Sequence, residues 1–164
     1  MEGALMPILT AAARSPDHGK LEPWRFVVLE RGALLRLAAL IESRGLVLGK
    51  TPEEVAKMRA QFADAHLAVT VVFSPKPSEK IPEVEQLLSA GAVCLALLNA
   101  ALAAGWGANW LTGWAAHDRG FAEAGLGLAP HERVAGLIHI GAETAAPPDR
   151  PRPDLAALAT WISE

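Results

Sequence analysis

The residues best suited to chemistry gather in one short stretch, "ARSPDHGKLEPWRFVVLE", which covers residues 13–30. Its charged and titratable side chains before the tryptophan include Arg14, Asp17, His18 and Lys20. An apolar run follows at residues 26–29 and is typical of a buried strand. Two interpretations stay open for this loop: a polar connector between a helix and a strand, or a loop that binds a ligand.

The rest of the sequence offers little chemistry of its own. It contains no G-x-S-x-G nucleophile turn and no H-E-x-x-H zinc motif, and its five histidines lack metal-ligand spacing. Glu83 and Glu85 stand where a long helix should begin, and carboxylates there stabilise the helix dipole, so we interpret them as structural. If the chain is an enzyme, we expect a bound cofactor to carry the reaction.

Composition narrows the possible partners and location. The 164 residues are 51% hydrophobic and 20% charged, with a net charge of −3, which indicates a globular protein. No basic stripe is present, so we expect no nucleic-acid partner. The single cysteine, Cys94, allows no intrachain disulfide and suits a reducing compartment. We see no signal peptide and no apolar run as long as a membrane span, and we expect a cytoplasmic protein without a membrane partner.

Hydrophobic periodicity predicts a protein of helices and strands that alternate along the chain. Helices are expected at residues 3–14, 32–45, 51–65 and 82–104, with a short one within 115–132. Strands are expected at residues 24–30, 66–75, 106–113 and 133–143. Thr51 and Glu54 form a predicted capping box, with Pro52 at the first helical position. From about residue 144 we expect a proline-rich tail, followed by a short helix that carries Trp161.

The long helix is apolar on nearly every side from residue 87 to 104, so it must be covered on every side. Small residues allow another helix to approach closely: Ala90, Gly91, Ala92, Ala96, Ala100 and Ala101. We interpret this segment as a central helix at a subunit interface. A helix buried entirely within one subunit remains the alternative.

The stretch at residues 13–30 resembles the signature loop of the FMN-dependent nitroreductase family, A-P-S-G-x-N-x-Q-P-W-x-F-V-V-V. Its P-D-H variant resembles the small YdjA-like branch of that family. Residues 82–113 and 133–143 agree with the family in order and spacing. The resemblance implies an α+β fold in a single domain of residues 1–164, arranged as three α/β/α layers. It also implies a mixed, mainly antiparallel sheet of about four strands, with the long central helix at a dimer interface.

The same resemblance implies a homodimer that binds FMN at its interface. Its reaction would pass a hydride from NADH or NADPH through the flavin to a small electrophilic acceptor, such as a nitroaromatic or a quinone. The chemistry would reside on the flavin, without a catalytic side chain or a metal. The alternative function is a non-catalytic dimer of the same fold with weak or lost flavin binding.

Site residues follow from the resemblance by position. Near the flavin of their own subunit would lie Arg14, Asp17, His18 and Lys20, with His18 as a hydrogen-bonding partner rather than a base. A second cofactor-binding segment would be formed by Trp110, Leu111, Thr112 and Gly113. The weaker nicotinamide-binding assignment covers Ala100, Ala101, Leu102, Ala103, Ala104 and Gly105.

The sequence departs from the family pattern at the FMN phosphate. The family has an R-R-S motif about two dozen residues before the loop, whereas residues 1–12 here contain no arginine. Leu111 stands where the YdjA-like pattern has an arginine. We expect a natural N-terminal segment outside this sequence, other phosphate donors, or weak FMN binding. The other donors would be Thr112, backbone N–H groups around Gly113, and the side chains of Arg119 and Arg133.

Overall fold

The structure is a computed structural model that describes residues 2–163. Four strands form one sheet in the order β1-β2-β4-β3. Their bounds are β1 (Trp24–Glu30), β2 (Leu67–Phe73), β3 (Gly107–Leu111) and β4 (Arg133–Gly141). All three neighbouring pairs are antiparallel. The expectation of a mainly antiparallel, four-stranded sheet is confirmed, and no parallel pair occurs within residues 2–163.

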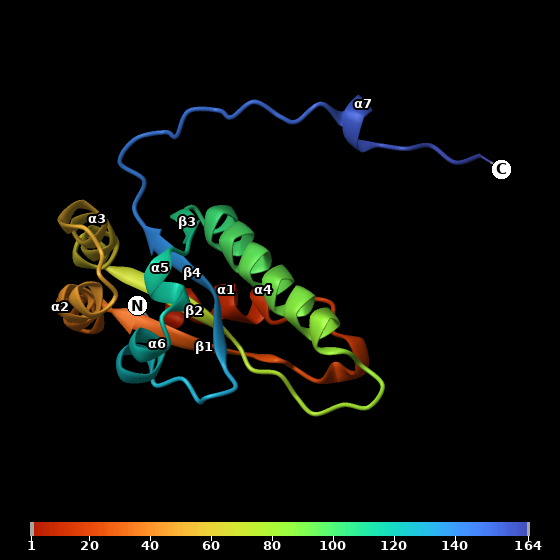
Figure 1. Cartoon of the computed structure of the whole chain (residues 1–164). Helices are drawn as coiled ribbons and strands as arrows, with labels where there is room; N and C mark the ends of the chain where they lie inside the picture. The colour runs from red at the N-terminus through yellow and green to blue at the C-terminus, as the bar shows by residue number, and fades with distance from the viewer. Residues whose placement is uncertain (1, 164) are drawn as a thin grey trace.

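Helices cover both faces of the sheet (Figure 1). They are α1 (Glu2–Ala12), α2 (Arg31–Val47), α3 (Pro52–Ala63), α4 (Glu83–Ala103), α5 (Trp114–His117), α6 (Arg119–Leu126) and α7 (Leu155–Leu158). The first and fourth helices pack on one face, and the second, third, fifth and sixth on the other. The three-layer α+β fold is therefore as predicted.

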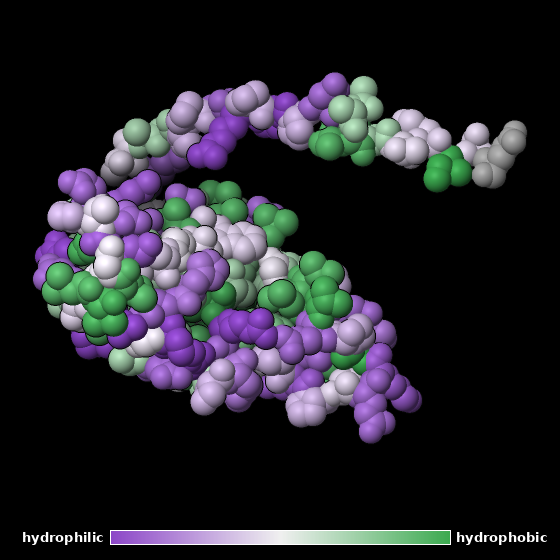
Figure 2. Space-filling view, viewed as in Figure 1, coloured by the Kyte–Doolittle hydropathy of each residue, from purple (hydrophilic) through white to green (hydrophobic). Residues whose placement is uncertain are grey.

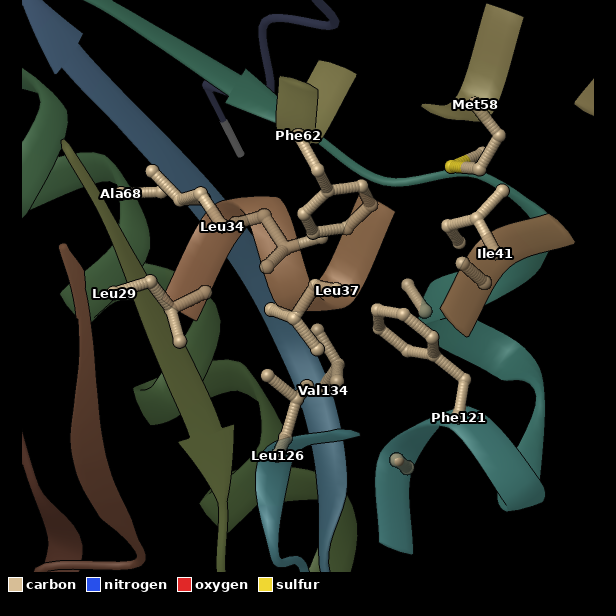
Figure 3. Close-up of a cluster of buried hydrophobic side chains, with 14 of the residues drawn as sticks. Leu29, Leu34, Leu37, Ile41, Met58, Phe62, Ala68, Phe121, Leu126 and Val134 are labelled. Atoms are coloured by element: carbon tan, nitrogen blue, oxygen red, sulfur yellow. The ribbon is translucent and has the colours of Figure 1, made fainter. Parts of the chain in front are cut away.

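Strand β2 lies between two strands and under helices on both faces, which explains its unbroken apolar run. Successive side chains of a strand point to opposite faces. Val69 and Val71 accordingly pack beneath α1 and α4, while Ala68 and Val72 pack beneath α2 and α3. Figure 3 shows the second of these clusters around Phe62. Each face of β2 therefore contributes to a separate core.

The predicted start of α3 is confirmed. The Thr51 hydroxyl accepts the backbone N–H of Glu54 at 3.2 Å, and the Glu54 carboxylate accepts the N–H of Thr51 at 2.9 Å. Pro52 occupies the first helical position, where no N–H donor is needed. The loop after α2 thus ends in a complete capping box.

Helix α4 corrects the expectation that no apolar segment is as long as a membrane span. Over an 18-residue window its mean hydropathy is 1.8, so this 21-residue helix is long and apolar enough for a membrane span by composition. Its buried positions, including Val93, Leu97 and Ala101, pack against α1 and the sheet. One side of α4 thus packs within the folded domain. Because only 33% of the window is buried, the other side is left uncovered by the chain itself.

The tail also differs from its prediction. After β4 the chain runs extended to a single helical turn, α7, and then continues without regular structure (Figure 1). Trp161 lies beyond α7 and is 92% exposed, so it is not part of the helix. Because Leu155, Leu158 and Ile162 are exposed as well, the tail covers no apolar surface of its own chain.

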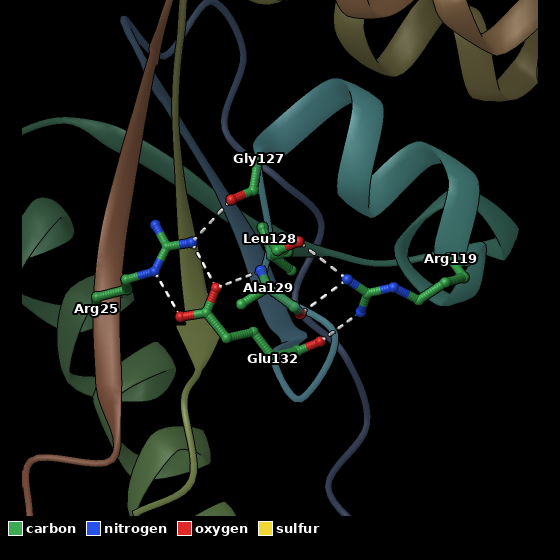
Figure 4. Close-up of polar contacts among 6 residues, drawn as sticks. All are labelled: Arg25, Arg119, Gly127, Leu128, Ala129 and Glu132. Carbon is green, nitrogen blue, oxygen red and sulfur yellow. Dashed lines mark hydrogen bonds and ion pairs between the residues drawn. The ribbon is translucent and has the colours of Figure 1, made fainter.

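A partly buried ion pair joins β1 to the loop before β4 (Figure 4). The Glu132 carboxylate accepts two hydrogen bonds of 2.7 Å from Arg25 and one of 2.9 Å from the N–H of Ala129. The hydrogen bonds from Arg25 lower the pKa of Glu132 to about 2, against the opposing effect of burial. The folded state therefore stabilises the ionised form of Glu132.

We predict that this carboxylate makes folding sensitive to acid. Its contribution to the free energy of unfolding is complete above the ordinary pKa of 4.5 and is lost as the pH falls toward about 2. Glu132→Gln should lower the free energy of unfolding at pH 7 by about 1–3 kcal/mol and flatten its decline between pH 5 and pH 2. Denaturant titrations at several pH values would measure both effects. Glu79→Gln, at an exposed loop position, is the control and should change neither.

Candidate functional site

The loop between α1 and β1 has an unusual backbone. Gly19, Lys20 and Glu22 adopt positive φ angles of 73°, 55° and 49°. A Cβ atom at Gly19 would overlap the end of the Ile81 side chain, which would have to shift, and the positive φ angle favours glycine. The Asp17 carboxylate fixes the turn by accepting the N–H of Glu22 at 2.7 Å. Such left-handed conformations at non-glycine residues concentrate at functional sites.

This loop lies against the first turns of α4. Nδ1 of His18 is 2.6 Å from Oε2 of Glu85. Together with Pro16, Leu88 and Ala92, this pair borders a surface concavity of about 290 Å³. The predicted residues Asp17 and His18 therefore open onto one hollow beside the helix.

Two cations of the loop are free to meet an anionic ligand. Arg14 and Lys20 are exposed and take part in none of the ion pairs within residues 2–163. A cation without an internal partner can form charge-assisted hydrogen bonds to a ligand. The position of both residues is compatible with their predicted role.

Arg119 and Arg133, the other phosphate donors expected from the sequence, both have partners within the fold. The guanidinium of Arg119 donates to the carbonyl groups of Leu128, Ala129 and Glu132 at 2.8–3.0 Å (Figure 4). Arg133 pairs with Glu83 and also lies over the ring of Phe73. Both side chains therefore hold the fold together, which their positions in the sequence did not indicate.

The second predicted segment lies at the end of β3. Trp110 is partly exposed, and its indole packs directly on Gly136 of β4, where a Cβ atom would overlap the ring. Gly113 lies against Met58 of α3, and Thr112, the residue before it, is exposed. The segment thus presents an aromatic ring and a hydroxyl group at the free edge of the sheet.

Leu111 lines a separate groove of about 770 Å³ between the end of α3 and the β3–β4 pair. Its polar lining includes Gln61, Asp64, Asn109 and His139, and no lysine or arginine of the described chain borders it. Burial lowers the pKa of His139, which favours its neutral form. The groove therefore offers no lysine or arginine to a phosphate.

The predicted nicotinamide segment occupies the last turn of α4 and the turn after it. Ala101 is fully buried, and its carbonyl accepts the N–H of Trp106. Leu102 and the residues through Gly105 are exposed. A rise of 1.5 Å per residue places Ala100 about 22 Å along α4 from Glu85.

One chain does not bring the predicted segments together. Figure 1 shows the loop of His18 beside the start of α4 and β3 beside its end. Between them runs an uncovered apolar stripe, on which Leu88, Leu95 and Leu102 recur every seven residues and are 68%, 51% and 49% exposed. Hydrophobic side chains are visible over α4 in Figure 2. This seven-residue spacing is typical of the seam between two packed helices.

The family model described as "Nitroreductase family" matches residues 2–142. The chain belongs to the nitroreductase family. Membership makes it an oxidoreductase of the nitroreductase type, as the motif at residues 13–30 predicts.

Individual relatives agree with the family assignment. This nitroreductase is 32% identical over 137 residues to YdjA of Escherichia coli (strain K12), which is named as an NAD(P)H nitroreductase. The match covers 84% of this chain and 74% of YdjA. A nitroreductase-like family protein from Bacillus cereus has the same fold, with a TM-score of 0.80, 24% identity, and coverage of 99% of this chain and 85% of that one. A mutant of the FMN and NADPH-dependent nitroreductase NfnB from Sphigopyxis sp. strain HMH also has this fold. Its TM-score is 0.72 and its sequence identity is 17%, and the match covers 98% of this chain and 89% of that one.

Sequence reasoning missed two residues at the candidate site of this nitroreductase. Glu85 was assigned to the helix dipole alone, yet it pairs with His18 across 67 positions of the chain. Gly136 lies beneath Trp110. No local signal marks either residue, because each acquires its neighbour only through tertiary packing.

We predict that Gly136→Ala displaces Trp110. The added methyl group would overlap the indole, and overpacking of this kind costs about 1–3 kcal/mol of stability. The intrinsic tryptophan fluorescence should shift, and the shift should disappear in the Trp110→Phe background. Gly32→Ala, where a methyl group meets nothing within 4 Å, is the control. An unchanged emission spectrum in Gly136→Ala would contradict the packing described.

Proposed function

We propose that this nitroreductase is an FMN-dependent enzyme that uses NADH or NADPH to reduce small electrophilic acceptors. The observation that carries the proposal is the pair of exposed segments at the two ends of the uncovered stripe of α4. One segment offers the free cations Arg14 and Lys20, and the other offers Trp110 and Thr112. Free cations, an aromatic ring and a hydroxyl group suit a planar, anionic cofactor.

The proposal requires a homodimer. A two-fold axis that crosses the middle of α4 near Leu95 would pair the stripe with itself, since such an interface uses the same patch on both subunits. The start of one α4 would then lie beside the end of the other. Residues 14–20 of one copy would meet Trp110 and Thr112 of the second copy, giving two equivalent sites. This arrangement agrees with the expectation of a flavin site at the dimer interface and assigns the two segments of each site to different subunits.

Each segment has a separate task in the proposed site. Arg14 and Lys20 place positive charge next to the cofactor, and His18 supplies a hydrogen bond. Trp110 excludes water from one edge, because its ring is fixed against Gly136. FMN, when bound, supplies the hydride chemistry between NADH or NADPH and an acceptor such as a nitroaromatic or a quinone.

The names of the relatives support the proposed cofactors. The structure from Sphigopyxis is named as FMN and NADPH-dependent, and the relative from Escherichia coli is named for NAD(P)H. We further propose that residues 1–164 act as one domain in the cytoplasm, with neither a nucleic-acid nor a membrane partner. The exposed tail residues, such as Trp161, would find cover on the second copy.

Direct binding tests the cofactor. We predict that the purified chain binds FMN and that Arg14→Ala weakens binding about tenfold, the scale of one charge-assisted hydrogen bond. Titration followed by flavin fluorescence would measure the dissociation constant, and circular dichroism would check the fold. Lys57→Ala, on the exposed side of α3, is the matched loss of a cation and should bind as the natural chain does. A natural chain that binds no FMN would overturn the proposed function.

The dimer has its own test. We predict a homodimer at micromolar concentration and a folded monomer for Leu95→Asp, because a charge at the centre of an apolar interface loses its hydration. Sedimentation equilibrium would measure the mass of each. Leu46→Asp places the same charge at another exposed leucine, at the end of α2, and should stay dimeric. A monomeric natural chain would refute the shared site.

A designed arginine at position 111 tests how the FMN phosphate is bound. We predict that Leu111→Arg tightens FMN binding by about tenfold, because the groove beside Leu111 lacks a cation. Leu111→Gln adds polarity without charge and should leave the dissociation constant within about twofold. Equal affinity in both variants would exclude an ionic contact from this position.

A further inference from the structure

The pairing of His18 with Glu85 gives the first turn of α4 a task beyond the helix dipole. Two carboxylates occupy this turn, and they have different partners. Glu83 pairs with Arg133, a contact that fastens β4 to the helix. Glu85 instead pairs with His18, at a separation of 2.6 Å between Oε2 and Nδ1. Only the second of these contacts reaches the candidate site.

The geometry of this contact fixes the imidazole. An ionised carboxylate can only accept hydrogen bonds, so the hydrogen lies on Nδ1 and is donated to Glu85. Nε2 is then the one ring nitrogen left for a ligand. The two side chains are 64% and 44% exposed, and they border the concavity that Leu88 and Ala92 also line. The ring therefore stands at the edge of a hollow with its second nitrogen uncommitted.

The surrounding structure holds the pair in place from both sides. The side chain of Gln86 hydrogen-bonds the main chain of Lys76 and the carbonyl of Ile81. Ile81 in turn fills the space against Gly19, next to His18. The loop thus contacts the start of α4 both through packing and through the ion pair.

We propose that Glu85 is a positioning residue of the flavin site: it holds His18 with Nδ1 protonated and directs Nε2 toward a polar atom of the flavin in the concavity. This inference rests on the proposed function. Leu88 belongs to the uncovered stripe of α4, so a second copy packed on that stripe also closes the hollow. Exclusion of water strengthens the pairing of the two groups, because their attraction grows as the local dielectric constant falls.

The first measurement follows the ring itself in the protein without cofactor. In ¹⁵N-histidine-labelled protein above pH 7.5, the natural chain should show His18 as the Nδ1–H tautomer. Glu85→Ala should lose that preference. Glu83→Ala removes the same charge from the same helical turn and should retain it. An Nε2–H tautomer in the natural chain overturns the inference.

The second measurement separates positioning from a mere tether between the loop and the helix. Glu85→Ala should raise the dissociation constant of FMN about tenfold, and Glu83→Ala should leave it within about twofold. His18→Asn keeps a donor close to the position of Nδ1 but removes Nε2, so it should bind FMN as weakly as Glu85→Ala. Full affinity in His18→Asn would show that only the tether matters.

The outcomes also distinguish the two proposals. If the natural chain binds FMN and the two glutamate variants bind it equally, the positioning role is wrong and the proposed function stands. If the natural chain binds no FMN, the proposed function fails, and the positioning role fails with it. In a His18→Ala background, Glu85→Ala should have no further effect on FMN binding, since residues that act through one another are not additive.

Discussion

The burial of helix α4 is the constraint on which the rest of the molecule depends. One side of the helix fills the core between α1 and the sheet through Val93, Leu97 and Ala101. The other side carries leucines at seven-residue intervals, which the chain itself leaves exposed. Large apolar patches of this kind mark interaction surfaces. A single helix thus serves the core of one subunit and, in the proposed dimer, the boundary between two.

The ends of α4 matter because they place the two halves of the proposed site. Glu85 in its first turns and Ile81 just before the helix support the loop with positive φ angles. Its last turn leads directly into the edge strand that carries Trp110. A helix of this length keeps the halves apart within one chain, whereas a two-fold axis across its middle brings unlike ends together. The length of the helix therefore becomes a reason for two subunits to share each site.

Several arginines of this protein stabilise the fold through partners within the chain. Arg25 and Arg119 fasten the loop before β4, and Arg44 pairs with Asp118 at 2.6 Å. The hydrogen bonds from Arg44 lower the pKa of Asp118, whose carboxylate also caps α6. Arg14 differs from these three arginines because it has no ion-pair partner in the described chain. The absence of an internal ion pair, rather than charge alone, distinguishes Arg14 from these structural arginines.

The sequence by itself determined the elements and the family. Period-2 and helical patterns located all four strands and the long helix, because these patterns reflect burial along a local element. The capping box at Thr51 was equally predictable, since its partners lie within one turn. The loop motif at residues 13–30 identified the nitroreductase family, because its chemistry and its spacing are contiguous in the chain.

Only the tertiary structure decided which side chains remain available for a ligand. Arg119 and Arg133 look like free cations in the sequence, but distant carbonyl groups and Glu83 occupy them. Glu85 pairs with His18, and Trp110 packs on Gly136; both contacts join residues that are far apart in the chain. Such contacts depend on how helices and strands are placed in three dimensions, and local periodicity contains no information about that placement.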